Sequence, residues 1–150
     1  MVRFRPEEVT LPARFLCKTA HLVAVLTVLF DVEAVVSQMY QIDPATTTNR
    51  ADLKLFSDRK RGVQGICYGA IACFGVEYIG LFLGISMFFP TAMALNILAH
   101  FAGTVLVALL YSDNWSYEAF AAFFAIFNIA PTVLELLMLV FVTRFSFLKY

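Results

Sequence analysis

The sequence predicts an all-α membrane protein built as a bundle of four transmembrane helices, each antiparallel to the next. Of its 150 residues, 61% are hydrophobic and 15% are charged, and the mean hydropathy is +0.78. A soluble domain is about 45–50% apolar and about 25% charged. Four segments are also long and apolar enough to cross about 30 Å of hydrocarbon, which takes about 20 residues of helix.

The transmembrane domain is expected to cover residues 12–142, between a tail of residues 1–11 and a tail of residues 143–150. Its four expected spans are residues 12–33, 63–86, 91–111 and 117–142. The last three spans follow one another closely, so consecutive helices must be antiparallel neighbours. Pro90 suits the start of the third helix, where its missing N–H is not needed.

The first span has the weakest signal, because its apolar run is short and lies between charged residues. This run, residues 22–30, follows Arg14 and Lys18 and precedes Asp31 and Glu33. A cleaved signal peptide is the competing interpretation, but the run lacks the small-x-small cleavage site. We therefore expect a membrane helix in which Arg14 and Lys18 extend to the near membrane surface.

The polar stretch of residues 37–61 is rich in Thr, Asp, Arg and Lys and has no apolar periodicity. It is expected to be an exposed loop, with room for a short helix near residues 53–56.

Six basic residues lie on the side of the termini and five on the other, so the positive-inside rule only slightly favours cytoplasmic termini. Asn114 begins a glycosylation sequon, but it lies so close to the membrane that a chance tripeptide in a tight turn is the simpler interpretation.

The remaining patterns indicate no enzyme. Cys17, Cys67 and Cys73 lie within or beside apolar segments, where thiols act as small apolar residues. The sequence has no Cys-x-x-Cys, nucleophile–base set, cofactor fingerprint or phosphate-binding loop. Its formal net charge is zero. We expect no cofactor, no nucleic-acid partner and no small-molecule substrate; the lipid bilayer is the expected environment.

Each expected span contains one deeply placed ionisable residue. These are His21, Glu77, His100 and Glu135. Each lies roughly 8–10 residues from the helix end on the side of the termini, a common depth of about 12–15 Å. The four side chains are therefore expected to form a buried polar cluster near the midplane.

A polar stripe accompanies this expected cluster. Asn96 shares a helix face with His100, and Asn128 and Pro131 share one with Glu135. Such faces should point into the bundle, because an ionisable group that faces lipid costs several kcal/mol. Hydrogen bonds that hold the helices together are the favoured interpretation, and a proton relay or ion site is the alternative. Zinc is a weaker alternative, because no ligand spacing is present.

The second span also carries two glycine pairs, Gly65-x-x-x-Gly69 and Gly80-x-x-x-Gly84. The pairs fall within about 100° of one another around a helix, so they form a candidate face for helix packing or a partner. Glycine is common in membrane helices, so a specific docking role stays open. Pro131 is expected to kink the fourth helix.

Several short fragments follow one another along the chain in a distinctive order. They are Arg14-Phe15-Leu16, Ala20-His21-Leu22-Val23, Phe74-Gly75-Val76-Glu77, Gly80, Gly84, Ser86-Met87-Phe88, Ala99-His100, Trp115 and Pro131-x-Val133-x-Glu135. In this order and spacing they resemble the transmembrane protein 107 family. The resemblance runs from about Leu11 to Val142, with no clear correspondence in the loop 37–61.

The resemblance implies a multi-pass protein of the cilium membrane at the transition zone, with both termini cytoplasmic. It further implies a non-enzymatic subunit of the Meckel-syndrome complex, with tectonics and other membrane subunits as partners, which contributes to ciliogenesis and to the gate on ciliary membrane proteins. The alternative is a small proton-coupled four-helix transporter that uses the buried Glu and His residues. Transporters of that type carry a lone essential carboxylate in the first helix, whereas here the glutamates lie in the second and fourth.

Overall fold

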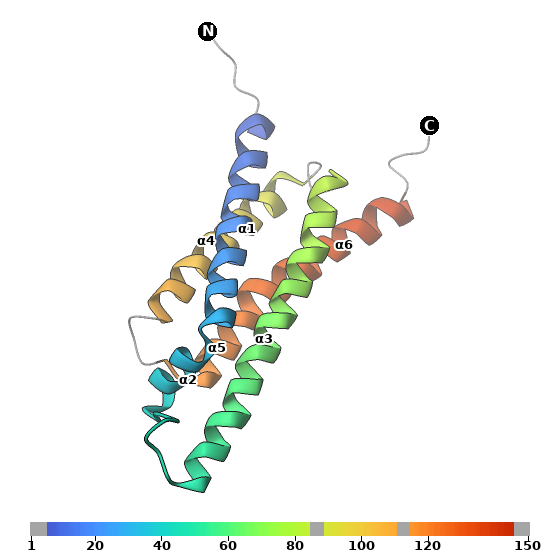
Figure 1. The fold of residues 1–150 in the computed structure, drawn as a ribbon. Coiled ribbons are helices and arrows are strands. Elements are labelled where there is room, and N and C mark those ends of the chain that lie inside the picture. The colour runs from blue at the N-terminus through green and yellow to red at the C-terminus, as the bar shows by residue number, and fades with distance from the viewer. Residues whose placement is uncertain (1–5, 85–88, 111–114, 146–150) are drawn as a thin grey trace.

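The computed structural model describes residues 6–84, 89–110 and 115–145 (Figure 1). These residues form helices and contain no strand, which confirms the predicted all-α class. The elements are α1 (Pro6–Phe30), α2 (Val32–Tyr40), α3 (Arg50–Phe82), α4 (Pro90–Leu110), α5 (Tyr117–Phe124), a π-helical turn η2 (Ala125–Ile129) and α6 (Ala130–Phe145).

Four segments within the described residues are long and apolar enough to cross a membrane, as predicted. They are Val9–Phe30, Arg50–Phe82, Pro90–Leu110 and Tyr117–Arg144. Helix α1 packs against both α3 and α4, and α6 packs against α3, while η2 lies against α4. The start of α1 and the end of α6 lie at the same end of the bundle, and the connection between α2 and α3 lies at the opposite end (Figure 1).

The expected loop of residues 37–61 is much shorter in the structure. Helix α2 continues to Tyr40 and α3 begins at Arg50, which leaves residues 41–49 between the two helices. The Asn49 side chain caps α3 by accepting a hydrogen bond from the Ala51 N–H at 3.0 Å. This cap and the burial of Phe56 stabilise a helical start that has no apolar periodicity.

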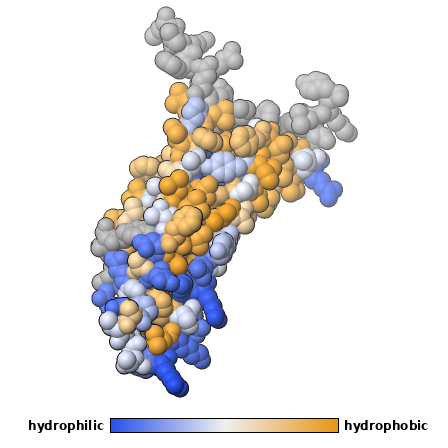
Figure 2. Space-filling view, in the orientation of Figure 1, coloured by the Kyte–Doolittle hydropathy of each residue, from blue (hydrophilic) through white to orange (hydrophobic). Residues whose placement is uncertain are grey.

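Helix α3 is longer than the membrane is thick. Its 33 residues span about 50 Å at about 1.5 Å per residue, against about 30 Å of hydrocarbon. The polar first turns therefore extend out of the bilayer beside α2. Figure 2 shows hydrophilic residues gathered at this end of the molecule and mainly apolar residues over the rest of the visible face.

The interior has two different halves. The apolar core lies away from the termini and includes Val28, Val36, Val63 and Phe74. The half nearer the start of α1 and the end of α6 buries the charged side chains alongside apolar ones such as Met138. At that end of the bundle, polar contacts thus add to apolar packing.

The fourth span contains a π-helical turn directly before Pro131. There the Ala130 N–H donates to the Ala125 carbonyl, five residues back. Proline cannot donate a backbone hydrogen bond and its ring crowds the preceding turn, so a wider turn accommodates it. The irregularity expected at Pro131 thus takes the form of a π-helical turn.

Candidate functional site

Six ionisable side chains lie together in the half of the bundle nearer the termini. They are Arg14, Lys18, His21, Glu77, His100 and Glu135, and none is more than 3% exposed. They come from all four membrane-spanning segments: three from α1 and one each from α3, α4 and α6. We call these six residues the charge cluster.

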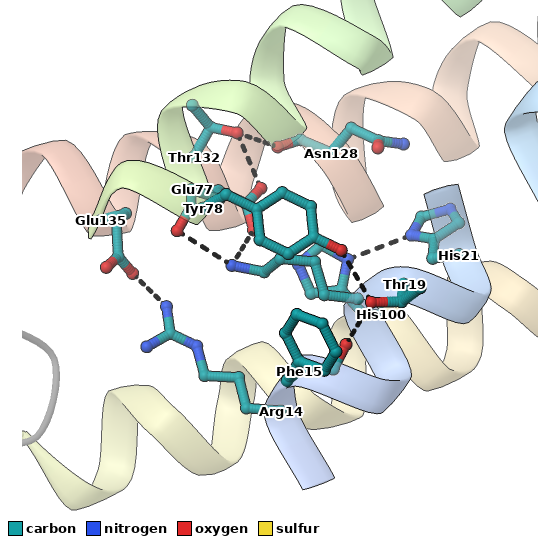
Figure 3. A network of polar contacts seen from close by, with 11 residues as sticks. Arg14, Phe15, Thr19, His21, Glu77, Tyr78, His100, Asn128, Thr132 and Glu135 are labelled. Carbon is teal, nitrogen blue, oxygen red and sulfur yellow. Dashed lines mark hydrogen bonds and ion pairs between the residues drawn. The ribbon is translucent and has the colours of Figure 1, made fainter. Parts of the chain in front are cut away.

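Glu77 on α3 is the centre of the charge cluster (Figure 3). Its Oε2 accepts a hydrogen bond from His100 Nε2 at 2.6 Å and forms an ion pair with Lys18 Nζ at 3.0 Å. Its Oε1 accepts a hydrogen bond from the Thr132 hydroxyl at 2.9 Å. One carboxylate therefore joins α3 to α1, α4 and α6 at the same level.

The two histidines extend this network. His21 Nδ1 and His100 Nδ1 lie 3.1 Å apart. Because His100 donates from Nε2 to Glu77, the Nδ1 of a neutral His100 ring is an acceptor. His21 must then donate from its Nδ1, which fixes its tautomer. The Phe74 ring packs edge-on against His21, with 5.2 Å between the ring centroids.

Arg14 and Glu135 form the second ion pair of the charge cluster. Glu135 lies directly against Gly80 of α3: a Cβ added at this glycine would stand 2.3 Å from Glu135 Oε1. A Cβ added at Gly103 of α4 would likewise stand 2.3 Å from His21 Cε1. Both glycines therefore make room for a member of the cluster, because any larger residue would collide with it.

The charges of the cluster balance. Arg14 pairs with Glu135 and Lys18 pairs with Glu77, so the two pairs carry no net charge when the histidines are neutral. An unpaired charge in a low-dielectric interior is strongly unfavourable, whereas a paired and hydrogen-bonded one is tolerated. The pairing explains how four charged side chains are accommodated within the membrane.

The structure brings together three of the four residues expected to meet. His21, His100 and Glu77 form one hydrogen-bonded chain, whereas Glu135 lies beside it, against Gly80, and pairs with Arg14. A common depth in the membrane does not determine which side chains become hydrogen-bond partners.

The expectation for Arg14 and Lys18 was wrong. Both were expected to extend to the membrane surface, and both are fully buried. Their long side chains reach Glu135 and Glu77 across the bundle. Spacings of four and three residues place Arg14, Lys18 and His21 on one face of α1, and this pattern in the sequence was the signal that identifies them.

The members of the polar stripe are all buried but have different surroundings. Pro131 lies beside the π-helical turn, and the Asn128 carbonyl shares the Thr132 hydroxyl proton with Glu77. The Asn96 side chain is 1% exposed, yet neither its nitrogen nor its oxygen has a hydrogen-bond partner. Asn114, the candidate glycosylation site, lies outside the described residues.

The four glycines of the second span do not share one face of contact. Gly80 contacts Glu135, and a Cβ at Gly69 would stand 3.2 Å from the Phe124 ring, so both face the interior. Gly65 is exposed, with nothing within 4 Å of an added Cβ. Gly84 lies beyond the end of α3 with a φ of 69°, a left-handed conformation that glycine adopts readily after a helix. Gly84 is therefore a turn residue and not part of a helix face.

The polar groups of the described residues form no recognisable metal site. No group of three or more His, Cys, Asp or Glu side chains in the described ranges is arranged to hold a metal ion. The basic partners of both buried carboxylates are Arg14 and Lys18. The chemistry that this arrangement supports is helix association through buried ion pairs.

Comparison with known proteins gives consistent matches. A family model described as TMEM107, transmembrane protein, matches residues 10–139. Transmembrane protein 107 of Homo sapiens is 29% identical over 142 residues, covering 92% of this chain and 92% of the relative. The Xenopus laevis protein is 28% identical over 129 residues (86% and 87%), and the Danio rerio protein is 26% identical over 128 residues (85% and 90%). No solved structure matches the chain.

The family match contains the whole charge cluster, from Arg14 to Glu135. It confirms the resemblance that the ordered sequence fragments indicated. The chain therefore belongs to the transmembrane protein 107 family.

Proposed function

We propose that this protein is a non-enzymatic structural subunit of a membrane-protein assembly at the ciliary transition zone, where it helps control which membrane proteins enter the cilium. The observation that carries the proposal is that Glu77 links α3 to the other three spans within a charge-balanced cluster. The resemblance to transmembrane protein 107 supports the location and the complex, with tectonics and other Meckel-syndrome subunits as partners.

The structure suits a protein that works by lateral contact. Most described residues belong to the four membrane-spanning segments, and large apolar side chains face outward on all four. A cluster that joins every span holds these outward faces in fixed relative positions. Such a bundle can act as a rigid membrane-embedded part to which other transmembrane helices attach.

The proposal is tested by replacing the central carboxylate. Glu77→Leu leaves the buried Lys18 amino group without its ionic partner, so the helices should separate or repack. A tagged variant in a ciliated cell should lose both its ring at the ciliary base and its co-purification with the other membrane subunits. Glu118→Gln is the matched control, because Glu118 is 71% exposed and its ion pair with Arg59 lies outside the charge cluster.

Retained assembly and localisation of Glu77→Leu would contradict the proposal. A proton-coupled transporter is the second candidate, because Lys18, Glu77, His100 and His21 form a continuous buried chain of titratable groups. A flux assay in liposomes with a pH gradient separates the two functions. Flux by the intact chain that Glu77→Gln and Glu135→Gln both abolish would replace the structural proposal with the transporter.

A further inference from the structure

A groove of about 210 Å³ lies between α4 and the fourth span, outside the charge cluster. Asn96 forms part of its lining, Ala99 and Ala130 are small residues on its two sides, and Leu95 and Ile126 line it with their side chains more than half exposed. Ile126 belongs to the π-helical turn, and Pro131 forms part of the same wall. We call this hollow the amide groove.

Asn96 is the unusual feature of the amide groove. Its side chain is 1% exposed, and neither amide atom has a hydrogen-bond partner among the residues that the structure describes. An unsatisfied buried donor or acceptor costs about 1–3 kcal/mol, and Asn96 has one of each. His100, one helical turn further along α4, joins the charge cluster, but Asn96 does not. The single chain therefore leaves this buried amide unsatisfied beside the hollow.

Acyl chains and glycerophospholipid esters cannot satisfy both atoms of this amide. Acyl chains carry no hydrogen-bonding groups, and the hydrocarbon region contains no water to replace them. The ester carbonyls of a glycerophospholipid accept hydrogen bonds but donate none, so they leave the Asn96 oxygen unpaired. A hydroxyl or amide side chain both donates and accepts, and such side chains join helices within membranes.

The groove also has the size and charge for one such side chain. A volume of about 210 Å³ is many times the volume of about 10–15 Å³ that a cavity needs by this measure to hold one water molecule, so a side chain can enter. Ala99 and Ala130 allow a neighbouring backbone to approach closely. Both ion pairs of the charge cluster are already complete, so a neutral occupant leaves the buried charge balanced.

We propose that the amide groove receives a transmembrane helix of another membrane protein, which inserts an uncharged Asn, Gln, Ser or Thr side chain that hydrogen-bonds to Asn96. The inference rests on the proposed role as an interaction subunit and assigns that role to one face, between α4 and α6. The partner's side chain supplies the donor and the acceptor that the single chain lacks.

Photo-crosslinking in the native membrane tests the inference. The photoreactive residue p-benzoylphenylalanine replaces Leu95 at the rim of the groove in the full-length chain, and Phe101 is the control position. Both side chains are lipid-exposed residues of α4, 54% and 60% respectively, but Phe101 does not line the groove. Illumination should give a protein adduct at Leu95 and not at Phe101. Mass spectrometry should place the linked peptide in an apolar segment that contains Asn, Gln, Ser or Thr.

Two further variants connect this adduct to the amide and to the groove. Asn96→Leu should reduce the adduct yield at least tenfold, and Ala130→Leu, which fills the groove, should do the same. Ala108→Leu, an equal enlargement at an exposed alanine of α4 away from the groove, should leave the yield unchanged. Asn96→Leu should not lower the thermal unfolding midpoint of the purified chain, because the amide makes no internal hydrogen bond.

Four results would overturn the inference: adducts with lipid only, adducts with a second copy of this chain, no adduct at Leu95, or a lowered unfolding midpoint for Asn96→Leu. The proposed function fails separately. If the chain co-purifies with other membrane subunits but gives no protein adduct at Leu95, only the assignment of this face is wrong. If it co-purifies with none of them, the proposed function is wrong as well.

Discussion

The Lys18–Glu77 ion pair should show strong energetic coupling, because each partner is fully buried and each neutralises the other. Lys18→Met preserves the length and volume of the side chain but removes its charge. Glu77 then keeps its hydrogen bonds to His100 and Thr132 without a neighbouring cation within hydrogen-bonding distance. Breaking one partner of a buried pair typically costs about 3–5 kcal/mol. Proteins of about 150–250 residues lose about 2–4 °C of unfolding midpoint per kcal/mol, so we expect a decrease of about 6–20 °C.

A double-mutant cycle tests whether the charge or the packing matters. Glu77→Gln alone should cost a similar amount, because it leaves the Lys18 ammonium unpaired. The double variant Lys18→Met/Glu77→Gln contains no unpaired charge, so it should cost less than the two single losses added together, with a coupling energy of about 1–3 kcal/mol. The measurement is unfolding of all four proteins in one lipid–detergent mixture. Additive costs, or a cost below about 1 kcal/mol for Lys18→Met, would refute the view that paired charges stabilise the bundle.

Three other changes have expected outcomes. Gly80→Ala should lower the free energy of unfolding by about 1–3 kcal/mol, because the new methyl group displaces Glu135, whereas Gly75→Ala, with nothing within 4 Å, should be neutral or slightly stabilising in the same unfolding assay. Gly103→Ala should also cost about 1–3 kcal/mol by displacing the His21 ring, and a nuclear magnetic resonance shift of that imidazole would report the displacement. Lys60→Ala removes an ion pair with the exposed Glu33 side chain and should change the unfolding free energy by less than about 1 kcal/mol; a larger loss would show that this pair supports the start of α3.

Much of the fold could be predicted from the sequence, because membrane spans require only length and apolar composition. The start of α3 could not, since Arg50 and its neighbours have no apolar periodicity. That start depends on the Asn49 cap and on Phe56 packing against the apolar core. Gly84 was misplaced because a spacing of four residues says nothing about where the helix ends.

The sequence predicted the glutamates and histidines of the candidate site but not its arginine and lysine. Lysine and arginine near a helix end are commonly assumed to reach toward water. Because of this assumption, Arg14 and Lys18 were not included in the predicted buried cluster. The two cations needed acidic partners on helices distant in the sequence, which no local pattern provides. The missing partner of Asn96 likewise became visible only once the neighbouring helices were in place.

The buried cations of α1 also affect how the chain enters the membrane during synthesis. Placing lysine or arginine at the centre of an inserting helix costs about 2.5–3.5 kcal/mol each, so Arg14 and Lys18 together oppose insertion of α1 by up to about 5–7 kcal/mol. Their counter-ions lie 59 and 121 residues further along the chain, and the second is synthesised last. We therefore expect α1 to insert stably only once its partner helices are present, and a chain truncated before Glu135, which leaves Arg14 without this partner, to be more readily recognised by membrane quality control.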